Sequence, residues 1–177
     1  QEGLRNLYKL VSKAHVDYYY KKPRLPWSVI EKYREGLIIG SACCYGELFQ
    51  SLVSHAYQEK RTGMMRRINA LRSEEQDRIA MKYDYLEIQP VINNRFMTEE
   101  EYYFEGRRGE NEDDLRAINK KILEIGDRLG KPVVATCDAH YDRPESAIYR
   151  NILMAGMGFE DAESGEGLYM RTTDEMM

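Results

Sequence analysis

The sequence contains the stretch Pro132-Val133-Val134-Ala135-Thr136-Cys137-Asp138-Ala139-His140. Its apolar first half is typical of a buried strand, and a carboxylate and an imidazole follow directly. Residues two apart on an extended segment project to the same side. The pattern therefore predicts that Asp138 and His140 meet at the end of a strand, where barrel and doubly wound folds keep their chemistry. The alternative is an Asp that caps a loop beside a solvated His.

Working outward from this strand, hydrophobic periodicity predicts alternating helices and strands. Capping boxes are predicted at Ser73 with Gln76 and at Thr172 with Glu175. Gly130 is expected to end a helix with one apolar face, formed by Leu115, Ile118, Ile122, Ile125 and Leu129. We expect helices near residues 4–20, 28–33, 46–57, 73–82, 111–129 and 144–155, and strands near 37–42, 83–90, 132–136 and 168–171, the strand at 37–42 being buried on both faces. Residues 93–110 and 156–167 are expected to be mainly loop. This order predicts a parallel α/β fold.

Composition limits the class of protein. The chain has 177 residues, about one domain, with 42% hydrophobic and 32% charged residues and a net charge of −4. No apolar run is long enough to span a bilayer. The three cysteines cannot build a disulfide framework, and no secretory leader precedes the first helix. We therefore expect a globular protein in a reducing cytoplasm, with no membrane partner.

Four residues are candidate metal ligands. Cys43 is expected to leave the first strand, and Asp138 and His140 leave a later one, so parallel strands would bring them to one rim. His15, near the end of the first helix, is the fourth. Thiolate, imidazole and carboxylate suit Zn²⁺, and Mn²⁺ accepts the oxygen and nitrogen donors. A purely structural role is as plausible for His15 and favoured for Cys43 taken alone.

Other polar and aromatic residues are assigned mainly structural roles. His55 and Cys137 are not expected to be ligands, and Glu87 is a weaker additional candidate. The 14 tyrosines, including Tyr18-Tyr19-Tyr20, could stack nucleic-acid bases, but packing is the favoured interpretation. Lys21-Lys22 with Arg24 forms a local basic spot that a solvated surface would also explain.

Both ends look like internal positions of a longer chain. Gln1-Glu2-Gly3 runs directly into a helical pattern without an initiator Met, and the capping box at Thr172 is followed by barely one turn of sequence. We therefore expect a fragment.

These motifs together resemble the PHP (polymerase and histidinol phosphatase) domain of the PolC-type DNA polymerase III alpha subunits of Gram-positive bacteria. The matching stretches include residues 3–12 with His15, residues 34–43, residues 83–90, and residues 130–136 with Asp138 and His140, and they extend to Arg171-Thr172-Thr173. The stretch from Ser54 to Arg72 looks longer than in that family. The resemblance implies that residues 1–177 are the C-terminal portion of a PHP domain, the second half of a distorted (β/α)₇ TIM-like barrel that resumes after an inserted exonuclease.

The resemblance also implies a ligand set and a cofactor. By motif, His15, Cys43, Asp138 and His140 carry over as metal ligands for Zn²⁺ or Mn²⁺, whereas the family's H-x-H motif and its further Asp, His and Glu ligands have no counterpart here. No catalytic residue carries over. A half barrel would leave an open edge, so the fragment is expected to homo-oligomerise.

Three functional hypotheses follow. The first is a metal-binding, structural module of a replicative polymerase, inactive alone, whose parent chain would use Mg²⁺, primer–template DNA, deoxynucleotides and replisome subunits and would carry a 3′-5′ exonuclease. The second is a metal-dependent phosphoesterase, in which clustered ions activate water and clamp a phosphate. The third is an α/β scaffold that binds no metal.

Overall fold

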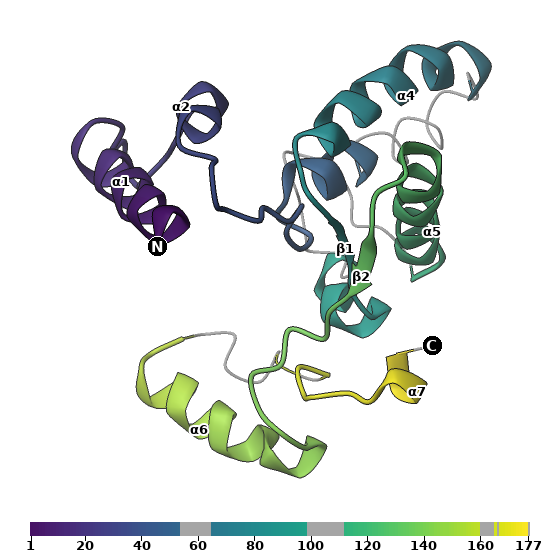
Figure 1. The fold of residues 1–177 in the computed structure, drawn as a ribbon. Helices are drawn as coiled ribbons and strands as arrows, with labels where there is room; N and C mark the ends of the chain where they lie inside the picture. The colour runs from purple at the N-terminus through teal and green to yellow at the C-terminus, as the bar shows by residue number, and fades with distance from the viewer. Residues whose placement is uncertain (54–64, 99–111, 160–164, 166, 177) are drawn as a thin grey trace. The chain divides into compact units, whose positions relative to one another are not determined.

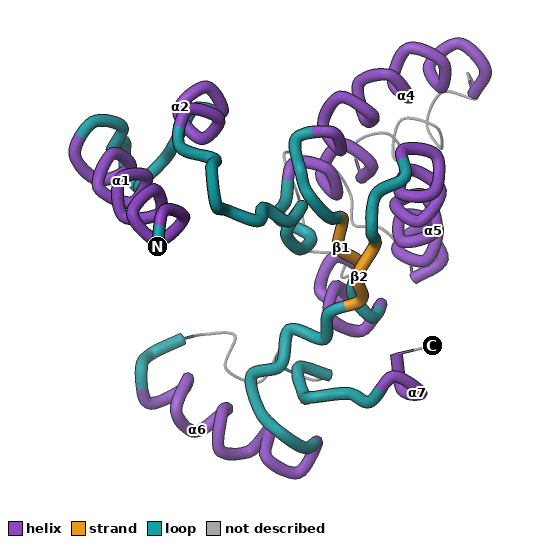
Figure 2. Tube along the Cα trace, viewed as in Figure 1, coloured by secondary structure: helices purple, strands orange, loops and turns teal. Residues whose placement is uncertain are grey.

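The computed structural model describes residues 1–53, 65–98, 112–159, 165 and 167–176, and the side chains of 65–72 lie outside that description. The chain divides into two compact units, Gln1–Ile39 and Gly40–Met177. Figure 1 shows the elements of each unit, and Figure 2 shows that helix and loop predominate over strand. Several expectations lie outside the described residues: the end of the helix predicted at 46–57, His55, most of the loop predicted at 93–110, and the first residue of the helix predicted at 111–129.

The first unit is a pair of helices, α1 (Glu2–Val16) and α2 (Trp27–Lys32). Buried Asn6 on α1 donates from Nδ2 to the carbonyl of Glu35, 2.9 Å away. Gly3 and Gly36 make the approach possible, since a Cβ on Gly3 would lie 2.0 Å from the Gly36 carbonyl oxygen. The first helix was expected to continue to residue 20, but α1 ends at Val16. The chain leaves the helix at Asp17 and turns tightly at Lys21.

The second unit is built on a parallel βαβ motif, which confirms the predicted α/β class. Strand β1 (Leu86–Ile88) pairs in parallel with β2 (Val133–Ala135), with Leu86 opposite Val133. Helix α5 (Glu112–Leu129) connects them and contacts both strands. The described residues form a two-stranded sheet.

Helix α5 supplies the core. Its predicted apolar face is confirmed: Leu115, Ile118, Ile122 and Ile125 are buried. Gly126 lets the end of the helix lie close to β2, because an added Cβ would stand 2.3 Å from Val133 Cγ2. Gly130 has φ +62° and ends the helix as predicted, and the Lys131 N–H bonds the Gly126 carbonyl.

The strand predicted at 37–42 is wrong. Ile38 is 81% exposed, and the segment makes a single parallel bridge, between Gly40 and Tyr85. The Ser41 N–H bonds the Tyr85 carbonyl, but the Glu87 N–H then bonds Ser41 Oγ instead of the next backbone carbonyl. Pairing stops because Ala42 has φ +62°, a left-handed conformation that no strand can continue.

Two further helices lie before β1. Residues 47–53 are helical, and α4 (Met65–Met81) is longer than predicted, so Ser73 lies within it and the capping box expected there is wrong. Lys82 Nζ, just beyond α4, pairs with Glu47 Oε1 at 2.8 Å. Buried Leu48, Leu52 and Ala80 extend the apolar core between these segments.

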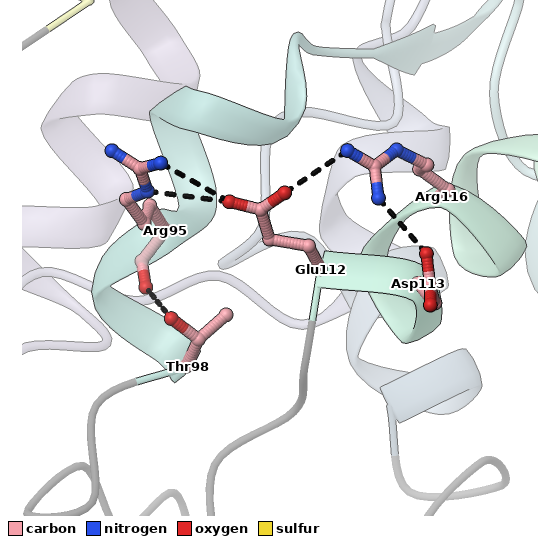
Figure 3. Close-up of polar contacts among 5 residues, drawn as sticks. All are labelled: Arg95, Thr98, Glu112, Asp113 and Arg116. Carbon is pink, nitrogen blue, oxygen red and sulfur yellow. Dashed lines mark hydrogen bonds and ion pairs between the residues drawn. The ribbon is translucent and has the colours of Figure 1, made fainter.

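A 3-10 helix, η1 (Val91–Thr98), follows β1 and contacts α5. Glu112, the first residue of α5, accepts from Arg95 Nη2 at 3.2 Å and from Arg116 Nη2 at 3.0 Å, and Arg116 also pairs with Asp113 (Figure 3). Carboxylates in the first helical turn also complement the helix dipole. These side chains are exposed, so the network orients η1 more than it stabilises the fold.

The C-terminal elements follow the predicted order. A 3-10 turn, η2 (Pro144–Ser146), leads into α6 (Ala147–Gly156), and α7 (Thr173–Met176) ends the described chain. The capping box at Thr172 is supported, because Glu175 Oε2 accepts from the Thr172 N–H at 2.8 Å. The expected strand at 168–171 is reduced to one parallel bridge between Tyr141 and Tyr169. Among the described helices, none has the length and apolar character needed to cross a bilayer.

Candidate metal centre

The D-x-H pair follows β2. The Thr136 N–H extends the ladder to the Ile88 carbonyl at 3.0 Å, and Asp138 then adopts φ +49°. His140 Nδ1 lies 3.9 Å from Asp138 Oδ1 and 2.8 Å from the Asp138 carbonyl oxygen. The two side chains therefore approach one another through a left-handed turn rather than through the alternation of an extended strand.

This turn determines which nitrogen of His140 is available. A carbonyl oxygen can only accept, so the contact from Nδ1 requires the proton to be on Nδ1. In the neutral ring, Nε2 then presents its lone pair. Metal-binding histidines commonly orient their rings in this way, with the other nitrogen donating to a carbonyl or a carboxylate.

His15 has the same arrangement on a different element. Its Nδ1 lies 2.9 Å from the carbonyl oxygen of Val11, one turn earlier in α1, so Nε2 again presents the lone pair. The side chain is exposed. His15 belongs to the unit Gln1–Ile39, whereas Cys43, Asp138 and His140 belong to the unit Gly40–Met177.

The two adjacent cysteines differ in their surroundings. Cys43 is half-buried in the turn after Ala42, and its carbonyl accepts from the Gly46 N–H at 2.8 Å. Cys44 is buried. Burial, the charge and hydrogen bond of Cys43, and the charge of Asp138 together raise the pKa of the Cys44 thiol to about 12. The exit from the bridge at Gly40 and the exit from β2 lie on either side of the same strand, because Gly40 bridges Tyr85 just before β1 and β2 pairs with β1.

The raised pKa gives a testable expectation for Cys44. In EDTA, with Cys43 and Cys137 replaced by Ser, iodoacetamide should still modify the chain more slowly at pH 8 than it modifies glutathione, because burial, the largest cause of the raised pKa, remains and little thiolate is present. The rate should rise by about tenfold per pH unit from pH 8 to pH 10. A rate that levels off below pH 9.5 would contradict the buried environment described for Cys44.

Two polar residues join the strand exits. Glu87 on β1, a weaker candidate from the sequence, accepts from Thr136 Oγ1 on β2 at 2.7 Å. Asn93 was missed: its Nδ2 donates to the Cys137 carbonyl at 2.9 Å, and its buried Oδ1 has no hydrogen-bond partner within the described part of the chain. The signal for Asn93 was an amide placed shortly after the Pro90 that closes β1.

The donor set of this region fits a borderline-soft divalent ion. Asp138 offers a carboxylate, His140 an oriented Nε2, and Cys43 a thiol on the neighbouring segment, which are ligand types that Zn²⁺ accepts. Across the described ranges, no three His, Cys, Asp or Glu side chains are gathered closely enough to hold an ion. The Asp138–His140 pair is thus the most closely associated part of the predicted set.

A parallel βαβ unit with acidic and imidazole groups at a strand exit is characteristic of α/β proteins that keep their chemistry at the carboxyl ends of strands. The chain belongs to the PHP domain family, whose model matches residues 1–91.

Relatives match over nearly the whole chain. A DNA polymerase III PolC-type of Clostridium perfringens is 46% identical over 179 aligned residues, covering 100% of this chain and 11% of the relative. The DNA polymerase III PolC-type proteins of Halalkalibacterium halodurans and Bacillus subtilis are 41% and 42% identical, covering 100% and 99% of the chain respectively and 11% of each relative. The chain therefore spans about one ninth of the length of these relatives, and the resemblance expected from the sequence is confirmed.

Proposed function

We propose that this chain is a PHP-domain segment of a PolC-type DNA polymerase III. The observation that carries the proposal is the match of the whole chain, at 46% identity, to 11% of one such polymerase. The parent enzyme would extend a DNA primer on a template from deoxynucleotides with Mg²⁺, and would carry a 3′-5′ exonuclease. Its partners would be DNA and other replisome subunits, in the cytoplasm.

Within that parent, residues 1–177 would form the C-terminal portion of the PHP domain. The β1–α5–β2 unit would contribute to the second half of a distorted (β/α)₇ barrel, because its two strands are parallel and the connecting helix α5 contacts both of them. The sheet formed by the described residues has two strands, and an open strand edge favours pairing with another chain. The isolated segment would therefore homo-oligomerise.

The proposed role of the segment is to hold a metal ion that supports the domain. His15, Cys43, Asp138 and His140 would be the ligands, with Zn²⁺ or Mn²⁺ as the ion. The geometry of His140 supports this role, since its Nδ1 is occupied by a carbonyl and its Nε2 is left to bind. Glu87, held by Thr136, and Asn93, held at the Cys137 carbonyl, would orient the surrounding chain.

The segment alone would lack catalytic competence. Phosphoester hydrolysis by clustered ions requires two or more ions about 4 Å apart, each with its own ligands. Four ligands are enough for one ion. The second candidate, a metal-dependent phosphoesterase, is favoured by one observation only, which is that the carboxylate of Glu87 lies on the strand beside β2 and could add a ligand.

Elemental analysis and a phosphatase assay separate these functions. We expect the purified 177-residue chain to hold about one equivalent of zinc or manganese and to leave p-nitrophenyl phosphate unhydrolysed in 1 mM Mn²⁺. A metal-dependent turnover that EDTA abolishes would favour the phosphoesterase. Failure to retain either metal after dialysis against micromolar zinc and manganese would refute the metal-binding role.

A further inference from the structure

The connector between α1 and α2, residues 17–26, carries a group of exposed aromatic rings. Tyr19 is 58% exposed and Tyr20 is 64% exposed, and Tyr18 is also exposed. A ring buries well in a core, so three consecutive tyrosines left in solvent are unusual for a structural connector. Packing, the interpretation favoured from the sequence, therefore does not account for this run.

Basic side chains lie beside one of these rings, that of Tyr20. Lys21 Nζ lies 5.7 Å and Arg24 Cζ lies 5.5 Å from the centroid of the Tyr20 ring. Within the described part of the chain, no carboxylate forms an ion pair with Lys21, Lys22 or Arg24. Lys13, one helical turn before the connector, is different because its Nζ pairs with Asp17 at 3.0 Å. The connector thus presents positive charge that no carboxylate among the described residues pairs with.

The turn that presents these groups is strained at Lys21. Lys21 has φ +60°, the Tyr20 N–H bonds the Lys22 carbonyl at 3.2 Å, and Tyr19 Oη donates to the Lys21 carbonyl at 3.2 Å. Glycine adopts this conformation with less strain than any other residue. A lysine at this position favours a role for its charge, since a turn alone would be formed more easily by glycine.

Charge is also divided unevenly between the two units. Residues 1–39 contain eight Lys or Arg and four Asp or Glu, whereas residues 40–177 contain 18 and 26. The first unit is therefore basic within an acidic chain. A local excess of positive charge attracts polyanions even when the net charge of the protein is negative.

We infer that the connector, through Tyr19, Tyr20, Lys21, Lys22 and Arg24, binds single-stranded nucleic acid. The cations would pair with backbone phosphates, and the exposed rings would stack on bases, which requires unpaired bases because a duplex hides their faces. This site lies apart in sequence from Asp138 and His140 and needs no metal. The inference therefore goes beyond the proposed function and does not depend on it.

Fluorescence anisotropy with a labelled 20-nucleotide oligo-dT and the 177-residue chain tests this inference. In EDTA and 50 mM NaCl we expect a dissociation constant of about 10 µM or tighter. Three phosphate contacts on a single strand predict a roughly 20-fold loss of affinity between 50 and 200 mM NaCl. A 20-base-pair duplex should bind more weakly than the single strand. Absence of binding at 50 mM NaCl, or equal affinity for the duplex, would overturn the inference.

Variants separate the rings from the charges. Tyr20→Ala should weaken oligo-dT binding at least about fivefold with little change in the salt dependence, whereas Tyr20→Phe, which keeps the ring, should bind like the parent. Lys21→Gly should weaken binding and reduce the salt slope by about 0.7, because one phosphate contact is lost. Its melting temperature should not fall, because glycine relieves the strained turn.

The matched charge control is Lys121→Gln, which removes a lysine from α5 in the acidic unit and should bind within twofold of the parent. If Tyr20→Ala and Lys21→Gly also bind like the parent, the connector is not the site. If poly-glutamate or vesicles of anionic phospholipid compete as well as oligo-dT, the surface recognises charge alone and the inference is wrong. Zinc and manganese contents are measured on the same preparations. A failure of the metal-binding proposal would thereby be distinguished from a failure of the nucleic-acid inference.

Discussion

Replacing His140 by Ala is expected to lower the zinc affinity of the chain by about 100-fold or more, because the change removes an oriented ligand rather than one of its supporting contacts. The structure supplies the reason for the large effect: Nδ1 is already bonded to the Asp138 carbonyl, so Nε2 is preset toward whatever the site binds. Competition of the chain with a chromophoric zinc chelator measures the affinity. Far-UV circular dichroism of the same sample reports whether the variant keeps its fold.

Two variants sharpen this prediction. Asp138→Asn removes the carboxylate but tolerates the left-handed backbone at φ +49°, so it should weaken zinc binding without changing stability. His55→Ala removes the histidine that has no predicted role and should leave zinc affinity unchanged. Equal affinities for the parent and for His140→Ala would refute the assignment of His140 as a ligand.

Replacing Ile122 by Ala is expected to reduce the free energy of unfolding by about 3 kcal/mol, since the side chain is 1% exposed in the core that joins α5 to the sheet. That is a large part of the stability of a small domain. Urea denaturation followed by circular dichroism measures the change, provided that protein concentration is held constant so that association does not contribute.

The neighbouring residue is the control. Leu123, the next residue of the same helix, is 43% exposed, and Leu123→Ala should cost less than about 1 kcal/mol. Both substitutions introduce a better helix former, so helix propensity does not explain a difference between them. Similar costs for the two variants would mean that α5 does not present the face described here to β1 and β2.

Elements with strong local signals were predicted well. The apolar face of α5, its end at Gly130 and the strand β2 follow from periodicity, a residue suited to positive φ, and a short apolar run, all of which are local properties. The parallel pairing of β1 with β2 also follows, because a helix of this length between two strands requires a crossover.

Elements that depend on distant contacts were predicted less well. The apolar run at 37–42 has the composition of a buried strand, but the left-handed turn at Ala42 limits it to one bridge. Ser73 and Gln76 match a capping box, yet they lie inside α4. The prediction failed because a sequence that can begin a helix can also lie within a longer one. The role of Asn93 was not predicted, because its contact with the Cys137 carbonyl joins segments 44 residues apart.

Reading the residues alone was enough to predict the family, the α/β class and the residue types available to a metal, because these depend on local pattern and on side-chain chemistry. Tertiary contacts were needed to show that His140 is oriented by the carbonyl of Asp138, that burial raises the pKa of the Cys44 thiol, and that Tyr19 and Tyr20 remain exposed close to basic side chains. The physical reason is that orientation, burial and electrostatic effects depend on the positions of groups in space, which backbone turns such as those at Lys21, Ala42 and Asp138 determine.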